Sequence, residues 1–270
     1  MKKDRSTIAL VGLFFVGLAL LLYPLLSDFW NSKVQTKVIA NYEDTLKQME
    51  SRDYSTYFAQ AEAYNQQIRQ VPFPLIHHDA VPGYADLLNI DGSGVMGYLS
   101  IDSIQVEMPI YHGTSPDVLN RAAGHLEGSS LPTGEPGTHT VLSAHRGLPS
   151  AKLFTDLDKL QIGDTFSLKV LDRVLTYQVD QILIVEPSQV EALAIEDGMD
   201  YCTLVTCTPY GINSHRLLVR GVRTQTVQKP KIFVPNEGIR IDPALVAPIV
   251  AAPMLLVLLI VLLIRYRKKP

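Results

Sequence analysis

The chain has 270 residues, with 24 Lys and Arg against 27 Asp and Glu, so its formal net charge is −3. This near-balance excludes a general nucleic-acid binder, which needs an excess of cations to pair with phosphates. Hydrophobic residues make up 47% of the chain and charged residues 19%, which excludes a disordered chain and indicates that part of it lies in lipid.

Two uncharged runs, Ile8–Leu26 and Ala244–Ile264, account for the hydrophobic excess. As helices, both are long enough to cross a hydrocarbon core of about 30 Å. A cleaved signal peptide is the alternative for the first run, but no Ala-x-Ala site follows it. A buried core helix is the alternative for the second. The basic residues that flank the two runs are Lys2, Lys3, Arg5, Arg265, Arg267, Lys268 and Lys269. The positive-inside rule therefore predicts that both chain ends are cytoplasmic and that the middle faces the outside.

The segment from 31 to about 70 is predicted to be helical, because apolar residues recur in it at three- and four-residue steps. These residues are Val34, Val38, Tyr42, Leu46 and Met49. We expect this amphipathic face to pack on the main domain. The segment Val71–Gly83 holds three prolines and a glycine, and is predicted to be a linker or surface loop.

Alternation of apolar and polar residues, typical of half-buried strands, begins at Tyr98. It predicts strands over Ile104–Ile110, Phe166–Val170, Leu175–Val179, Tyr201–Cys207 and Arg216–Val222. Many short strands, few helices and no strand–helix repeat favour a mainly β fold, either an antiparallel barrel or a sandwich.

Both cysteines, Cys202 and Cys207, lie in one predicted strand and are five positions apart, so their side chains point to opposite faces. A disulfide between them would break the strand, although cysteines outside the cell are normally paired. Cys202 is predicted to be a small buried filler. Cys207 ends the strand just before Thr208, where a side chain can reach a cleft. Its position alone supports a nucleophile and a buried filler about equally.

Two further residues can assist a nucleophilic thiol. If the flanking strands form a hairpin, Arg216 faces Cys207 at its mouth, where a permanently charged guanidinium can stabilise a thiolate or an oxyanion but cannot act as a base. An arginine that merely closes a strand is the alternative. His145 ends the strand-like run 138–145 and is modestly favoured as the acid/base, with His125 and His215 as competitors. No metal-ligand spacing, phosphate-binding glycine motif or Gly-x-Ser-x-Gly occurs, so we expect no metal and no cofactor.

The run Thr203-Leu204-Val205-Thr206-Cys207, followed by Arg216, matches the Thr-Leu-x-Thr-Cys…Arg signature of sortases. The chain resembles their pilin-polymerising class C group from about Gly94 to Arg223. The matching stretches are GVMGYLSI, PIYHGTS, GHLEGSSLPTG, HTVLSAHRGLPSAKLFTDLDKL and TLVTCTPYGINSHRLLVRG. The resemblance implies an eight-stranded β-barrel with added N-terminal helices and, with the two apolar runs, two transmembrane helices.

The resemblance also implies roles for individual residues. Cys207 would be the nucleophile, His145 the proton-transferring histidine, and Arg216 the oxyanion-stabilising or substrate-positioning arginine. The substrate-binding residues that it implies are Ser143, Ala144, Leu204 and Thr206. Class C enzymes usually carry a lid with an Asp-Pro-aromatic triplet, but here Asp79 to Tyr84 occupies that region without the triplet. A short lid, a different lid and no lid all remain open.

The implied substrates are pilins or surface proteins with a C-terminal Leu-Pro-x-Thr-Gly-like sorting signal. A Cys207 thioester would be resolved by a pilin lysine, and membrane lipid is the other expected partner. The alternatives are a sortase that uses a peptidoglycan amine, a cysteine protease, and a membrane-tethered binding domain with inert cysteines. The expected domains are a cytoplasmic tip and anchor or signal (1–27), a helical and lid region (28–92), a catalytic barrel (93–225), a linker (226–243), a second transmembrane helix (244–264) and a basic tail (265–270).

Overall fold

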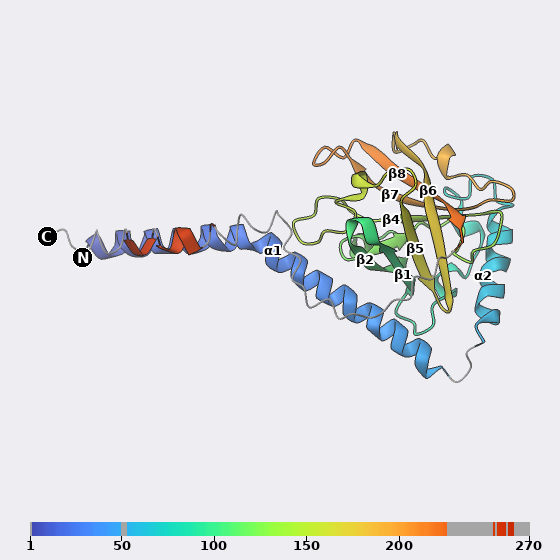
Figure 1. Ribbon diagram of the computed structural model, residues 1–270, viewed down its shortest axis with the longest axis horizontal. Coiled ribbons are helices and arrows are strands. Elements are labelled where there is room, and N and C mark those ends of the chain that lie inside the picture. Colours follow the sequence, from blue (N-terminus) through green and yellow to red (C-terminus); the bar gives the residue numbers. More distant parts are fainter. Residues whose placement is uncertain (1, 50–52, 226–250, 252, 258, 262–270) are drawn as a thin grey trace. The chain divides into compact units, whose positions relative to one another are not determined.

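The computed structural model describes residues 2–49, 53–225, 251, 253–257 and 259–261 (Figure 1). The chain divides into two compact units, one formed by Met1–Trp30 with Gln228–Pro270 and the other by Asn31–Val227. Helix α1 (Lys2–Gln48) contributes its residues 2–30 to the first unit and its residues 31–48 to the second. The other described residues of the first unit, at 251, 253–257 and 259–261, are also helical.

Helix α1 contains the predicted apolar run Ile8–Leu26. Among the described residues it is the one helix long and apolar enough to cross a membrane, by length and composition, with the candidate span beginning at Val11. Its large apolar side chains are uncovered, since Leu13 is 71% and Leu20 72% exposed. Most of the second predicted span, 244–264, lies outside the described residues.

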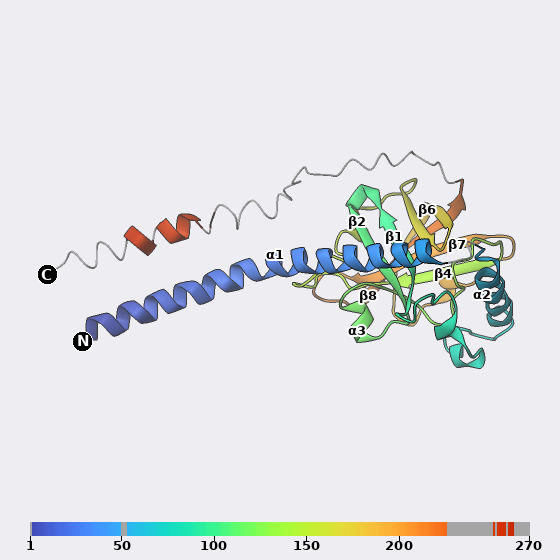
Figure 2. The ribbon, with the colours of Figure 1, turned by 90° about the horizontal axis from the view of Figure 1, so that it is seen from below.

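The second unit is built around a closed barrel of eight strands (Figures 1 and 2). In chain order they are β1 (Val95–Ile101), β2 (Val106–His112), β3 (Ala123–His125), β4 (Thr138–Ser143), β5 (Thr165–Val170), β6 (Arg173–Val185), β7 (Asp200–Thr208) and β8 (His215–Thr224). Their order around the barrel is β1-β2-β3-β4-β7-β8-β6-β5. The expected eight-stranded β-barrel with N-terminal helices is therefore confirmed.

Pairing within the barrel is mixed, so the prediction of antiparallel pairing is wrong for two of the eight neighbouring pairs. Strands β2 and β3 run parallel, and so do β4 and β7, whereas the other six neighbouring pairs are antiparallel. Alternation shows which side of a strand is buried but not the direction of its neighbour. Parallel pairs need long crossovers, and the β4–β7 crossover contains β5 and β6, which pair with each other as a hairpin.

Helices cover part of the barrel, as the helical prediction for 31 to about 70 expected. The described helical residues in this segment are 31–48 of α1 and α2 (Ser55–Ile68). Tyr42 is 1% exposed, and its hydroxyl donates to the Met96 carbonyl at 3.2 Å and accepts from the Leu171 amide at 2.9 Å. The remaining helices are short: α3 (Pro116–Leu119) and single 3₁₀ turns at His78–Ala80, Tyr84–Asp86, Asp102–Ile104, Leu157–Lys159 and Glu191–Leu193.

The packing of the barrel interior leaves room for only a small side chain at position 202. Cys202 is fully buried and pairs with Gly221 across β7 and β8. The stacked rings of Phe166 and Tyr177 fill the space beside them, and a Cβ at Gly221 would lie 2.8 Å from atoms of both side chains. Neither cysteine forms a disulfide. Cys202 is therefore the buried filler that the sequence predicts.

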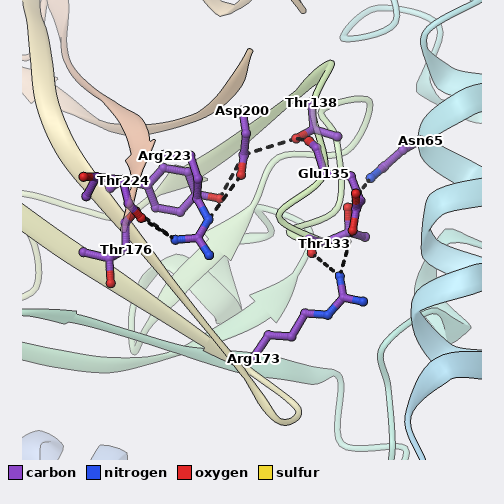
Figure 3. Close-up of polar contacts among 10 residues, drawn as sticks. Asn65, Thr133, Glu135, Thr138, Arg173, Thr176, Asp200, Arg223 and Thr224 are labelled. Atoms are coloured by element: carbon purple, nitrogen blue, oxygen red, sulfur yellow. Dashed lines mark hydrogen bonds and ion pairs between the residues drawn. The ribbon is translucent and has the colours of Figure 1, made fainter. Parts of the chain in front are cut away.

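A buried carboxylate, Asp200, begins β7, at the opposite end of this strand from Cys207. Figure 3 shows it between Thr138 and Arg223. The Tyr177 hydroxyl and the Thr138 hydroxyl donate to one of its oxygens at 3.1 and 3.2 Å, and Arg223 Nε lies 3.6 Å from the other. The Asp200 side chain is only 5% exposed. Burial raises the pKa of this carboxyl from 3.8 to about 6, against the opposing effects of these three partners.

We expect the Asp200→Asn substitution to change how stability depends on pH. Between about pH 4 and 6 the native carboxyl keeps a proton that the unfolded chain has lost, so this group's contribution to stability falls as pH rises. Asparagine has no such proton. The free energy of unfolding of the variant, relative to wild type, should therefore increase by roughly 2 kcal/mol from pH 4 to pH 7. Urea unfolding of both proteins at the two pH values measures this; an unchanged difference would contradict it.

Candidate active site

Three neighbouring strands, β4, β7 and β8, bring the predicted catalytic residues to one end of the barrel. Cys207 and Arg216 are direct partners in the antiparallel ladder of β7 and β8. Side chains at such paired positions stand on the same face with their Cβ atoms about 5 Å apart. The predicted hairpin, with Arg216 opposite Cys207 at its mouth, is confirmed.

Strand alternation places the Cys207 thiol on the outer face of the barrel wall. Positions 202 and 204 belong to the buried core, while Val205 and Cys207 are half-buried. Farther along the same outer face, Thr203 is covered: its hydroxyl lies 2.7 Å from His139 Nε2, and His139 Nδ1 donates to the Ala194 carbonyl at 2.8 Å. The connection between β6 and β7 thus covers this face near Thr203, and the face becomes accessible toward Cys207.

His145 reaches the same face from β4. Ser143 pairs with Val205 in the parallel ladder, and the Ala144 amide continues it by donating to the Val205 carbonyl at 3.2 Å. Two residues farther along the chain, the first segment reaches His145, just after the end of β4, and β7 reaches Cys207. His145 is half-buried, and the ladder, which continues to Ala144, directs this segment toward the Cys207 end of β7.

The two competing histidines, His125 and His215, lie in surroundings that do not suit a role as the acid/base. His125 is fully buried, and burial lowers its pKa to about 4. Its Nε2 donates to the Ser130 carbonyl at 2.9 Å, so its Nδ1 accepts from the Tyr84 hydroxyl at 2.8 Å. His215 occupies the position before Arg216 on β8, which faces the other side of the strand, and its Nδ1 lies 2.8 Å from the Ser214 hydroxyl. Of these three histidines, His145 alone is half-buried and follows the β4–β7 ladder toward the Cys207 end of β7.

The charge of Arg216 has no acidic partner among the described residues. Its Nη1 donates to the backbone carbonyls of Asn213 and His215 at 3.3 and 3.1 Å, and the ion pairs of the described chain do not include it. The barrel's other outer arginine on this strand, Arg220, is held by Asp180 through contacts of 2.7 and 3.2 Å. A half-buried guanidinium without a carboxylate, directly opposite a thiol, is available to stabilise negative charge.

The four predicted substrate-binding residues divide into two groups. Leu204 belongs to the core cluster, and Thr206 and Ala144 are 2% and 3% exposed. The Thr206 hydroxyl donates to the Ala144 carbonyl at 2.8 Å, so both residues tie β7 to β4 behind the outer face. Ser143, in contrast, is half-buried on the outer face beside Val205. The structure therefore places Ser143 at the site and the other three beneath it.

The predicted lid residues lie against a different part of the barrel. The Tyr84 hydroxyl accepts from the Gly113 amide at 3.0 Å in addition to bonding His125, and its ring stacks on the His125 ring. Asp79 is exposed. Between residues 71 and 86, all of them described, no hydrogen bond or ion pair reaches Cys207, His145 or Arg216. Tyr84 thus fastens this segment to β3 and to Gly113, the residue directly after β2.

Comparison with known proteins identifies the family. The sortase domain model matches residues 99–224. Sortase C1 of Streptococcus agalactiae is 47% identical, with a TM-score of 0.64 over 70% of this chain and 98% of its own. Sortase C of Streptococcus pneumoniae is 46% identical, with a TM-score of 0.62 over 70% and 97%. Clostridium perfringens sortase C, solved with a C-terminal cell wall sorting motif, is 42% identical, with a TM-score of 0.61 over 70% and 99%. The chain therefore belongs to the sortase family of cysteine transpeptidases and, within it, to class C.

Proposed function

We propose that the chain joins pilin subunits through a Cys207 thioester, with His145 transferring protons and Arg216 stabilising the oxyanion. The observation that carries this proposal is the direct pairing of Cys207 with an arginine that has no carboxylate partner in the described part of the chain. A thiolate needs a positive neighbour to form near neutral pH, and the oxyanion of acyl transfer needs donors already in place. The opposed positions of Cys207 and Arg216 meet both needs.

The proposed reaction has two steps. The Cys207 sulfur attacks the Thr carbonyl carbon of a Leu-Pro-x-Thr-Gly-like signal, the Thr–Gly C–N bond breaks, and His145 protonates the leaving Gly amine. A lysine amine of a second pilin then attacks the thioester and loses a proton to His145, which forms an isopeptide bond and frees the Cys207 thiolate. The covalent intermediate divides one difficult transfer into two easier ones.

The likeness to solved proteins supports the substrate class. The Clostridium perfringens sortase C structure contains a C-terminal cell wall sorting motif, and that of Streptococcus pneumoniae sortase C is described in terms of pilin substrate specificity. The half-buried side chains of Ser143, Val205 and Cys207 form an outer surface against which such a peptide can lie.

A competition between acceptors tests the proposal. The full chain in detergent is mixed with a protein that carries the sorting signal, together with equal amounts of a pilin and of a peptidoglycan stem peptide with a free amine. Mass spectrometry of the products should show isopeptide bonds to a pilin lysine. Transfer only to the stem peptide would instead assign the chain to cell-wall anchoring, and release of free acid despite both amines would assign it to proteolysis.

We further infer that both chain ends are cytoplasmic and that the barrel unit lies outside the cell membrane, anchored by α1 and by a second helix over 244–264. The basic residues outside both apolar runs support this arrangement. An amine reagent that does not cross membranes, applied to intact cells, should label lysines between 31 and 227 but not Lys2, Lys3, Lys268 or Lys269. Equal labelling of the two groups would contradict the topology.

A further inference from the structure

Arg146, the residue after His145, has a nearly buried guanidinium that reaches toward the cysteine strand. Its side chain is 11% exposed. One terminal nitrogen forms an ion pair with Asp158, in the 3₁₀ turn Leu157–Lys159, and the other lies 3.5 Å from the hydroxyl of Thr208, the residue after Cys207. Its buried Nε has no hydrogen-bond partner among the described residues. Burying a cation with so few partners costs free energy of folding. A functional role next to His145 and Cys207 would explain why this arginine is present.

The segment Phe154–Asp158 braces the backbone on both sides of Arg146. The Phe154 amide donates to the His145 carbonyl at 3.1 Å, and the Thr155 hydroxyl accepts from the Gly147 amide at 3.1 Å. Phe154 and Leu157 are fully buried, which anchors this brace in the core. Three consecutive residues, 145 to 147, are thus held by one core-anchored segment, and Arg146 is the only one of them held through its side chain.

The histidine and cysteine segments are also tied to each other on both sides of the reactive pair. Before the pair, the Thr206 hydroxyl donates to the Ala144 carbonyl at 2.8 Å. After the pair, Arg146 contacts Thr208. Because β4 ends at Ser143, no continuous backbone ladder fixes the distance from His145 to Cys207. The Thr206–Ala144 and Arg146–Thr208 contacts therefore lie on either side of His145 and Cys207, where the backbone ladder has ended.

We propose that Arg146 is a positioning residue for acyl transfer, which sets His145 against Cys207 by bridging Asp158 and Thr208; the proposal rests on the roles of His145 and Cys207 given above. A planar guanidinium donates in several fixed directions and can hold two partners at once, whereas a lysine ammonium is a single point of charge. Misplacing a catalytic group by about 1 Å costs on the order of 100-fold in rate.

The test separates kcat from KM. Acyl-enzyme formation is followed for the full-length wild type and for Arg146→Gln, Arg146→Lys, Asp158→Asn and the Arg146→Gln/Asp158→Asn double variant. We expect Arg146→Gln to lower the rate constant about 10- to 100-fold with KM within about twofold. Arg146→Lys should recover only a small part of this loss, and the double variant should be no slower than Arg146→Gln, because both changes break one bridge.

Arg220→Gln is the matched control. Arg220 is also nearly buried, at 16% exposure, and also binds an aspartate, Asp180, but this pair lies farther along β8 from the site. It should lose stability and keep its rate constant. A wild-type rate constant in Arg146→Gln, an equal loss in Arg220→Gln, or a change in KM alone would overturn the proposal. Asp158 is 46% exposed, so Asp158→Asn keeps the test decisive if Arg146→Gln does not fold. Acyl-enzyme formation by the wild type tests the Cys207 thioester separately, so a failure of the proposed function can be distinguished from a failure of the Arg146 proposal.

Discussion

Replacing Cys207 by alanine should abolish the joining of substrate to acceptor, whereas replacing Cys202 by alanine should leave it within about twofold of wild type. The two residues have the same chemistry but opposite surroundings. Cys202 is fully buried in the barrel, and burial raises the pKa of its thiol well above the usual range, so it stays neutral and inaccessible. Cys207 is half-buried on the outer face opposite the Arg216 charge.

Product formation on denaturing gels, with both variants at equal concentration, measures this contrast. Cys202→Ala is a matched control because it removes the same sulfur atom from the same strand and creates only a small cavity in the core. The binding-domain alternative predicts the opposite outcome, in which function survives in Cys207→Ala. Covalent product in the Cys207→Ala reaction would therefore contradict the mechanism.

Replacing Arg216 by alanine should lower kcat/KM by roughly 100- to 1,000-fold, the range found when one oxyanion-stabilising donor is lost. Arg216 has no carboxylate partner among the described residues, so its charge contributes little to the stability of the fold. Arg216→Lys keeps the charge but loses the planar fork and should recover only part of the activity. Both substitutions should change the thermal unfolding temperature far less than they change kcat/KM.

Steady-state kinetics with a fluorogenic sorting-signal peptide, together with thermal unfolding of each variant, tests this role of Arg216. His215→Ala is the neighbouring control: this residue precedes Arg216 on β8, bonds Ser214 and faces the other side of the strand. It should keep its activity within about twofold. If His215→Ala were as damaging as Arg216→Ala, the effect would belong to the loop and not to the guanidinium.

Strand alternation predicts β5 to β8 well, because each has one face in the barrel core and one toward solvent or a covering loop. It misses β3, which is too short to show a period, and it cannot show that β4 and β7 run parallel. The parallel pairing matters most for the site, since it carries His145 toward Cys207. The position of Arg216 opposite Cys207 can be predicted from the sequence because only a short loop separates the two strands, whereas the β4–β7 contact joins segments that are distant in the chain.

Other features of the site depend on side-chain packing that a pattern does not report. Burial removes His125 as a competitor for His145 and places Leu204 in the core. The contact of Arg146 with Thr208 was not predicted, although a charged residue directly after a strand-end histidine was a signal that could have drawn attention to it. The fastening of Tyr84 to His125 depends in the same way on distant segments meeting.

The most direct measurement of the central claim is the intact mass of the enzyme after mixing with substrate. The full chain in detergent is incubated with Leu-Pro-x-Thr-Gly peptides without an acceptor amine, and the adduct is mapped by peptide digestion. We expect an adduct with the mass of the peptide up to its Thr, attached to Cys207 and removed by hydroxylamine, as for a thioester. An unmodified wild-type enzyme under conditions where substrate is consumed, or an adduct that persists in Cys207→Ala, would contradict it.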